Sequence, residues 1–234
     1  DNTTKRRLLP VTGISNAIAV STGDRHNCAL LEDKSIRCWG RNLDGELGDG
    51  TNENPRKIPV TVYGISNAVA VDTGNRHSCA LLDNRSIACW GRNDNGQLGD
   101  GTTNSSYFPV VVSGISNAIK IGLGSYHTCA VLDNKSVKCW GRNNYGQLGN
   151  GETTSAQDNT SIPLALVETQ DVKDVDAKGI STCAVLDNKS VHCWGRNNYG
   201  QLGNGETTSA QDNTSIPVAL VETQDVKDVD AKGI

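Results

Sequence analysis

The sequence is poor in the residues that build one large apolar core. Its 234 residues include no methionine, one phenylalanine and only 4% aromatic residues in total. This composition suits thin stacked sheets, and recurring clusters of leucine, isoleucine and valine distinguish it from a disordered chain. No apolar run reaches the roughly 18 residues that a membrane-spanning helix needs, and no signal peptide is visible. We therefore expect no insertion into a membrane.

Signals for catalysis, cofactors and polyanions are also missing. There is no nucleophile elbow, phosphate loop or convincing carboxylate pair, so we expect no enzymatic activity and no cofactor. The net charge is −4 and the basic residues are scattered, which argues against nucleic acid as the main partner. No Cys-x-x-Cys occurs and the histidines are not spaced as co-ligands, so no zinc site is predicted. The Asp/Asn/Gly loops lack the bidentate glutamate of a calcium loop and are expected to be turns.

What the sequence does contain is internal repetition. The first cysteine of a recurring stretch falls at positions 28, 79, 129 and 183, giving spacings of 51, 50 and 54 residues. A period near 50 with short strands is typical of propeller blades. Residues 128–180 and 182–234 differ only at two positions, Lys138 against His192 and Leu164 against Val218. We define a single repeat domain over 1–234, with units of approximately 10–58, 59–108, 109–162 and 163–216 and a partial unit 217–234.

Each unit contains four strand candidates and no helical period. In the first unit these are residues 17–20, 28–31 and 35–39 and a proline-led run at 59–62. Proline cannot donate to a strand ladder, so it is expected at the first residue of an edge strand. Position 37 varies among the units, so its side of the strand is expected to face solvent. The loop after the third strand carries glycines at fixed offsets and one leucine, such as Leu47, that is expected to plug the seam between blades.

The prediction is an all-β fold of the β-propeller type with four four-stranded blades visible. Five proline-led runs (at Pro10, Pro59, Pro109, Pro163 and Pro217) accompany only four hairpins, and both ends of the chain carry the same pieces. We therefore expect part of a longer array or a larger assembly, in which unclosed ends expose sheet edges that invite association. A processed chain or a window from a longer one would also explain the absence of methionine.

These motifs resemble the regulator-of-chromosome-condensation repeat family. The resemblance rests on the Gly-x-x-His approach to the first cysteine, the Cys-Trp-Gly-x-Asn strand end and the Gly-Gln-Leu-Gly loop, and it covers essentially the whole chain. It implies propeller blades, which form seven-bladed rings in the family. Members include nucleotide exchange factors for small GTPases, enzyme inhibitors, light sensors and secreted or surface modules, so the resemblance leaves function open.

Three function hypotheses follow. The first is a non-enzymatic extracellular or surface module, a building block of a fibre or assembly, whose partners are proteins or copies of itself, with glycans as further candidates. The second is an intracellular partner-binding propeller in the cytoplasm or nucleus, such as a small-GTPase exchange factor. The near-identity of the last two units counts against this, because a specific GTPase site needs blades that differ. The third is a carbohydrate-binding propeller.

The eight cysteines form four Cys-x9-Cys pairs, which suggests one disulfide per blade. A two-residue hairpin turn would place Cys28 opposite Trp39, whereas a three-residue loop centred on residue 33 places it opposite Cys38. Where the family has Asp-Gly, this chain has pairs such as Asp33-Lys34, and lysine at positive φ is costly, so we favour the longer loop. Buried free thiols are the alternative. The predicted pairs are Cys28/Cys38, Cys79/Cys89, Cys129/Cys139 and Cys183/Cys193.

Glycosylation sequons are the second hint of an extracellular setting. Three lie on the predicted hairpin turns, although asparagine and serine are also ordinary turn residues. The candidate glycosylation sites are Asn84, Asn104, Asn134, Asn159, Asn188 and Asn213, besides Asn2 near the start.

Two further repeated residues could bind ligands but are better explained by packing. A histidine precedes the first cysteine in three units, and we expect it to hydrogen-bond a backbone group in the blade seam. The fourth unit has Ser181 there and Lys178 in place of the glycine, so one seam is expected to be looser. One tryptophan per blade could form a sugar-stacking ladder, but packing is the favoured role. The predicted seam residues are His26, His77, His127, Trp39, Trp90, Trp140 and Trp194.

Overall fold

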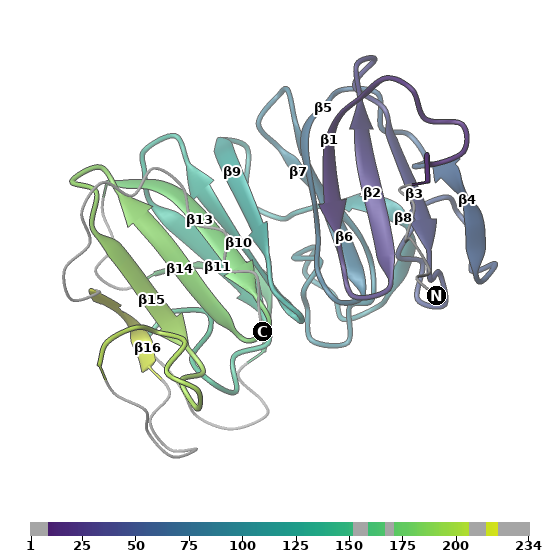
Figure 1. Cartoon of the computed structure of the whole chain (residues 1–234). Helices are drawn as coiled ribbons and strands as arrows, with labels where there is room; N and C mark the ends of the chain where they lie inside the picture. Colours follow the sequence, from purple (N-terminus) through teal and green to yellow (C-terminus); the bar gives the residue numbers. More distant parts are fainter. Residues whose placement is uncertain (1–8, 152–158, 167–170, 206–213, 220–234) are drawn as a thin grey trace, which may run out of the picture.

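The computed structural model is an all-β array of four four-stranded antiparallel sheets (Figure 1). It describes residues 9–151, 159–166, 171–205 and 214–219. In every sheet the strands follow chain order from one edge to the other. The strands are β1 (Ala17–Thr22), β2 (His26–Leu31), β3 (Ile36–Gly40) and β4 (Arg56–Thr61); β5 (Ala68–Thr73), β6 (His77–Leu82), β7 (Ile87–Gly91) and β8 (Ser106–Val111); β9 (Ala118–Leu123), β10 (His127–Leu132), β11 (Val137–Gly141) and β12 (Thr160–Ala165); β13 (Val172–Lys178), β14 (Ser181–Leu186), β15 (Val191–Gly195) and β16 (Thr214–Ala219).

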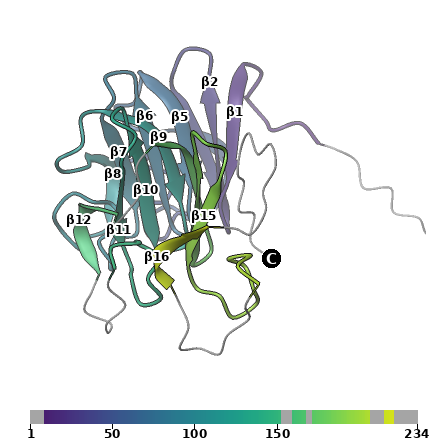
Figure 2. The same cartoon turned by 90° about the vertical axis from the view of Figure 1, so that its left-hand side faces the viewer.

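Each sheet is a propeller blade, and the blades are stacked face to face. The first strands β1, β5, β9 and β13 contact one another in succession, which makes them the inner side of the array. The first and last blades lie at opposite ends of Figure 1, and in the turned view of Figure 2 most strands run roughly vertically, so the connections gather at two opposite faces. Within the described residues there is no helix long and apolar enough to cross a membrane.

The core is divided among the seams between blades. One cluster joins Cys28, Ile36 and Leu47 of the first blade to Ala88 and Trp90 of the second. Leu47 therefore lies in the seam, as the sequence predicted. The expectation that position 37 and its equivalents face solvent is wrong for the second blade, because Ala88 packs against the preceding blade and is 3% exposed. Middle strands are covered on both faces, which explains why they are apolar on both.

The proline-led strands are edge strands, but two details differ from the prediction. Pro59 is the fourth residue of β4, and it lies where the register between β3 and β4 shifts, so its missing N–H falls at an irregularity in the ladder. Pro10 is not in a strand. The units defined from the proline-led runs are also offset from the sheets, because each such run closes the blade before it; β4 pairs with β3, not with β5.

Candidate functional site

The central hairpin of each blade carries a disulfide at the middle of its ladder. In the first blade Cys28 pairs directly with Cys38 across β2 and β3, and their Cα atoms are 4.1 Å apart. Residues 32–34 form the three-residue loop that this register requires. Six of the eight cysteines lie in core clusters that join two blades, Cys183 and Cys193 lie in a cluster within the fourth blade, and no described cysteine is free. The four disulfides are Cys28–Cys38, Cys79–Cys89, Cys129–Cys139 and Cys183–Cys193.

The longer loop does not spare the turn lysine a positive φ, contrary to the expectation that favoured this loop. Lys34 has φ of 63°, so the loop still places a lysine in the left-handed region, and the equivalent residues Arg85, Lys135 and Lys189 do the same. A three-residue hairpin loop itself ends in such a residue, and glycine is its usual occupant. Both the two-residue turn and the three-residue loop place a residue at positive φ, so the cost of a lysine there does not distinguish between them.

Contacts with the next blade explain why a long cation occupies this turn. The Lys34 carbonyl accepts a hydrogen bond from the Ala68 N–H at 3.0 Å, at the start of the neighbouring inner strand. The Lys34 ammonium pairs with Asp83 at 3.1 Å. Both side chains are about half exposed, so the ion pair adds at most about 1 kcal/mol, whereas the backbone bond fixes the blade position. The corresponding ion pairs are Arg85–Asp133 and Lys135–Asp187.

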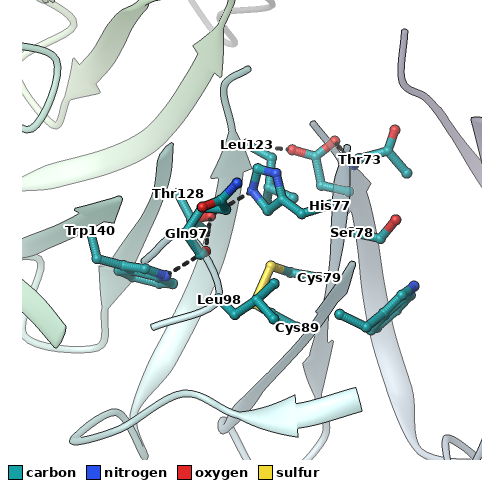
Figure 3. The surroundings of a disulfide bond; sticks show 12 residues. Thr73, His77, Ser78, Cys79, Cys89, Gln97, Leu98, Leu123, Thr128 and Trp140 are labelled. Atoms are coloured by element: carbon teal, nitrogen blue, oxygen red, sulfur yellow. Dashed lines mark hydrogen bonds between the residues drawn. A yellow bond between two sulfur atoms is a disulfide. The ribbon is translucent and has the colours of Figure 1, made fainter. Parts of the chain in front are cut away.

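The predicted seam histidines bind hydroxyl groups of the next blade, not the backbone. His77 Nε2 lies 2.9 Å from Thr128 Oγ1, and that hydroxyl donates to the Gln97 carbonyl at 3.0 Å. Trp140 donates its indole N–H to the same carbonyl at 2.9 Å (Figure 3). A histidine, a hydroxyl and a tryptophan thus converge on one loop carbonyl beside Leu98. The other two seams repeat this set, as His26, Ser78, Glu46 and Trp90, and as His127, Thr182, Gln147 and Trp194.

This network fixes the protonation of the histidines. Because the Thr128 hydroxyl gives its hydrogen to a carbonyl, it must accept from His77 Nε2–H, which leaves Nδ1 unprotonated. The Nδ1 atoms of all three histidines are buried without a partner. Burial lowers the pKa of His26 to about 4 and the pKa values of His77 and His127 to about 3. Each imidazole lies in a different seam, and among the described residues the three do not gather into a group that could hold a metal ion.

The two departures in the fourth unit are physically linked. A Cβ at Gly74 would lie 2.4 Å from the Gly124 carbonyl oxygen of the next blade and 2.7 Å from Nδ1 of His77, so the histidine and the neighbouring backbone both favour glycine at that position. The fourth unit has Ser181 and no imidazole, so Lys178 can occupy the glycine position. Its ammonium reaches the Thr22 carbonyl of the first blade at 3.4 Å. In the other blades the histidine contacts the next blade, so the looser seam expected from Ser181 would lie on the face of the fourth blade that points away from the third. That expectation stays a prediction.

Asp72 ties three blades together and was not found from the sequence. Its carboxylate accepts from the Ser21 hydroxyl of the first blade and from the Leu123 N–H of the third, both at 2.8 Å. Burial raises the pKa of Asp72, against the lowering effect of these hydrogen bonds. At the position equivalent to Asp72, the preceding unit has a serine and the following unit has a glycine (Gly122). Only the second unit combines an aspartate with these two neighbours, so the repeat pattern gave no signal for its role.

The polar loops are turns held by asparagine side chains, as expected. Asn42 Oδ1 accepts from the Leu47 N–H at 3.0 Å, while its Nδ2 donates to Asp49 and to the Thr51 carbonyl. Glu46 is fully buried where the other units have glutamine, and it pairs with Arg41 at 2.6 Å. Burial raises the pKa of Glu46. In the part of the chain that the structure describes, no group of His, Cys, Asp and Glu could hold a metal ion.

The sequon asparagines fall into two groups. Asn84, Asn134 and Asn188 are exposed on hairpin turns, where each side-chain oxygen accepts from the serine of its own sequon. Asn104 is exposed in the loop before β8. Asn159 is half-buried and its Nδ2 donates to Asn95, so this site does not suit a glycan in the observed conformation. Asn2 and Asn213 lie outside the described residues.

The tryptophans are also seam residues by position. Trp90, Trp140 and Trp194 are completely buried. They cannot form the sugar-stacking ladder that was considered as their alternative role. Trp39, in the first blade, is partly exposed.

Comparisons with known proteins agree with this architecture. Two family models described as Regulator of chromosome condensation (RCC1) repeat match, one at residues 17–46, 68–97, 118–147 and 172–201, the other at 38–81, 89–131, 136–185 and 189–231. A similar curated protein is the X-linked retinitis pigmentosa GTPase regulator homolog of Caenorhabditis elegans, 37% identical over 36% of this chain and 6% of its own length. Another is the Regulator of chromosome condensation of Drosophila melanogaster, 32% identical over 41% of this chain and 18% of its own length.

A solved structure shows the same fold. Prp20p from Saccharomyces cerevisiae superposes with a TM-score of 0.78 at 21% identity, and the match covers 91% of this chain and 52% of Prp20p. The chain therefore spans about half of that structure and a smaller share of the curated relatives. Repeat motif, blade topology and family models coincide in all four blades, so the chain belongs to the Regulator of chromosome condensation (RCC1) repeat family.

Proposed function

We propose that this chain is a non-enzymatic interaction module that works outside the cell or on its surface, where it binds proteins or copies of itself. The observation that carries the proposal is the disulfide in every blade. Disulfides form and persist in oxidising compartments and are rare in the cytosol. Each one here closes the middle hairpin of a blade and lies in a buried core cluster, which in the first three blades is the seam with the next blade.

Exposed apolar strands support association as the means of action. On β1, Ile18 and Val20 are 61% and 64% exposed, whereas Ala68 at the start of β5 is buried by the blade beside it. The edge strands β4 and β8 add exposed Ile58 and Phe108. Apolar sheet surfaces of this kind are contact sites for another protein or another copy. Assembly into a fibre is the most specific form of this proposal.

Two alternatives come from the family. Relatives named as GTPase regulator and Regulator of chromosome condensation favour an intracellular partner-binding propeller, such as a small-GTPase exchange factor. That alternative requires reduced thiols and gains nothing from the blade disulfides. A carbohydrate-binding propeller is less favoured, since the buried tryptophans remove the stacking platform that suggested it.

The deciding experiment is the intact mass of the chain purified from its native source with free thiols trapped by N-ethylmaleimide. We expect no adduct before reduction and eight after it, one for each cysteine. A chain carrying the Cys79→Ser and Cys89→Ser substitutions is the matched control and should take up two fewer adducts. Eight adducts before reduction would exclude the extracellular proposal. The same spectra show whether hexose masses are attached, which Asn84→Gln, Asn134→Gln and Asn188→Gln variants would remove.

A further inference from the structure

One arginine occupies the same loop position in every blade, directly after the third strand. In the first blade the Arg41 N–H donates to the Arg25 carbonyl in the turn between β1 and β2, at 2.9 Å, so both loops lie at the same face of the array. The same backbone bond recurs at the later arginines. The equivalent residues are Arg41, Arg92, Arg142 and Arg196.

The first two of these arginines are neutralised by carboxylates of their own loops. Arg41 pairs with Asp44 at 3.1 Å and with buried Glu46. Arg92 donates from Nε to Asp94 at 2.8 Å and pairs with it through a second nitrogen as well. The positive charges of Arg41 and Arg92 are therefore neutralised by carboxylates of the same blade.

The other two arginines stack on tyrosines instead. The third and fourth units have Asn-Tyr in the loop, so neither carries the aspartate of the first two. The Arg142 guanidinium lies 5.6 Å from the Tyr126 ring centre and 5.9 Å from that of Tyr145. The Arg196 guanidinium lies 5.4 Å from the same Tyr145 ring. Among the described residues, no carboxylate forms an ion pair with Arg142 or Arg196.

These side chains form one surface that we call the arginine–tyrosine patch: Tyr126, Arg142, Tyr145 and Arg196. Tyr199, three residues after Arg196 in the same loop, is 85% exposed, and the Nε of Arg196 is buried without a partner. Stacking on a tyrosine face holds a guanidinium by its plane and leaves its edge N–H groups available for a planar anion. Arginine and tyrosine are also the residue types that dominate binding energy at protein interfaces.

The chemistry of the patch selects a carboxylate-bearing protein segment. Two arginines are too few for a polyanion such as nucleic acid, which binds through many phosphate contacts, and the chain as a whole carries −4. A guanidinium edge matches a carboxylate with two parallel hydrogen bonds. In an extended segment, alternate side chains are about 7 Å apart on one face. That spacing suits two arginines of neighbouring blades that contact the same ring.

We propose that the arginine–tyrosine patch binds an extended acidic segment of a partner protein, with carboxylates at alternate positions contacting Arg142 and Arg196. The inference rests on the proposed role as an interaction module and names the chemistry of its partner. Arg142 and Arg196 are partly buried, so we expect the contact to be stronger than one between freely exposed charges.

The test uses the oxidised chain, with its four disulfides verified by mass, and a fluorescently labelled peptide that alternates glutamate with valine. Fluorescence anisotropy should show binding that a glutamine counterpart of the peptide lacks and that weakens as salt rises. The double variant Arg142→Gln with Arg196→Gln should lose at least about tenfold in affinity. Arg92→Gln is the matched control and should stay within about twofold, as should Tyr145→Phe, which keeps the ring.

Three outcomes would overturn the proposal: no binding of the acidic peptide, equal binding of the glutamine peptide, or equal losses in Arg92→Gln and the double variant. Inorganic triphosphate and the unlabelled glutamate peptide are compared as competitors of the labelled peptide. If triphosphate displaces the labelled peptide at lower concentrations than the unlabelled peptide does, the patch is a general anion site and the proposal is also overturned. All of these binding measurements use the chain with its disulfides intact. Failure to bind the peptide would therefore not contradict the proposal that the protein works outside the cell. Conversely, free thiols in the native chain would contradict the extracellular proposal without bearing on peptide binding by the patch.

Discussion

The three buried histidines should make this protein sensitive to mildly acidic pH. In the folded chain the pKa is about 4 for His26 and about 3 for His77 and His127, against 6.5 without burial. As pH falls below 6.5 the unfolded chain takes up protons at these residues and the folded chain does not, so the free energy of unfolding decreases. Near pH 5 the loss is about 2 kcal/mol for each histidine and about 6 kcal/mol for the three together.

Other titrating groups do not produce the same change in that range. Buried Glu46 and Asp72 have raised pKa values, so they act in the opposite direction. Carboxylates with lowered pKa values, such as Asp49, lose their contribution only near and below their usual value of 3.8. His192 is half-buried with a lowered pKa and adds a smaller effect of the same sign. The interval from 6.5 down to about 4.5 therefore reports on the seam histidines.

The assay is urea unfolding followed by fluorescence of the buried tryptophans, repeated between pH 8 and 5. The wild-type midpoint should fall steeply below pH 6.5. A triple variant, with His26→Gln, His77→Gln and His127→Gln, should be less stable at pH 8, because it loses seam hydrogen bonds of about 1 kcal/mol each. Its midpoint should, however, be nearly independent of pH. Parallel pH profiles for the two proteins would contradict this prediction, because the protons would then bind at residues other than the three histidines.

The remaining predictions concern the seams and turns. Replacing Cys79 and Cys89 by serine should lower the free energy of unfolding by about 2–3 kcal/mol, with no further loss from that hairpin on reduction, as measured by urea titration. Leu98→Ala empties a fully buried seam position and should cost about 2–5 kcal/mol, which a thermal melt would show. Because burial raises the pKa of Glu46, Glu46→Gln should stabilise the chain by up to about 1 kcal/mol at neutral pH and lose that advantage near pH 4. Lys135→Gly relieves a φ of 64° but removes an exposed ion pair, so its net effect on the urea midpoint should be within about 1 kcal/mol, and a larger loss would show that the pair matters more than its exposure allows.

The blade architecture could be derived from the sequence because it depends on local signals that recur. Cysteine spacing, proline placement and the glycine-rich loop repeat in register, so each unit repeats the evidence of the others. The pairing of Cys28 with Cys38 could be predicted because the number of residues in the hairpin loop determines which residues lie opposite each other. Exact strand bounds did not follow, because β4 begins three residues before Pro59 and tolerates it at a register shift. Propensity rules place proline on edges without fixing its position along them.

The contacts between blades could not be derived, because they join residues about 50 positions apart. Lys34 looked like a poor turn residue until Asp83 and the Ala68 N–H of the next blade were placed beside it. Asp72 has an equivalent aspartate only in the fourth blade, Asp176, and it gains its role from Ser21 and from the Leu123 N–H in the blades on either side. One signal was available and was missed: Lys178 and Ser181 replace glycine and histidine together, which indicates that those two positions touch.

The seams also explain how nearly identical blades can carry a specific surface. Every seam uses the same carbonyl, hydroxyl, imidazole and indole groups, and these are buried, so repetition there preserves stacking. The loop positions next to that network are partly buried in the first three blades and exposed in the fourth, and their side chains lie outside the shared hydrogen bonds, which frees them to differ. The position of Asp44 in the first blade is occupied by Tyr145 in the third with the seam geometry intact, and Arg142 is held on an aromatic face where Arg41 is neutralised within its own loop. Duplicating that unit as the fourth blade then placed a second such arginine, Arg196, against the same ring. Repetition of the blade thus creates a two-arginine surface that a single unit cannot form, and any partner that recognises the pair must contact both blades at once.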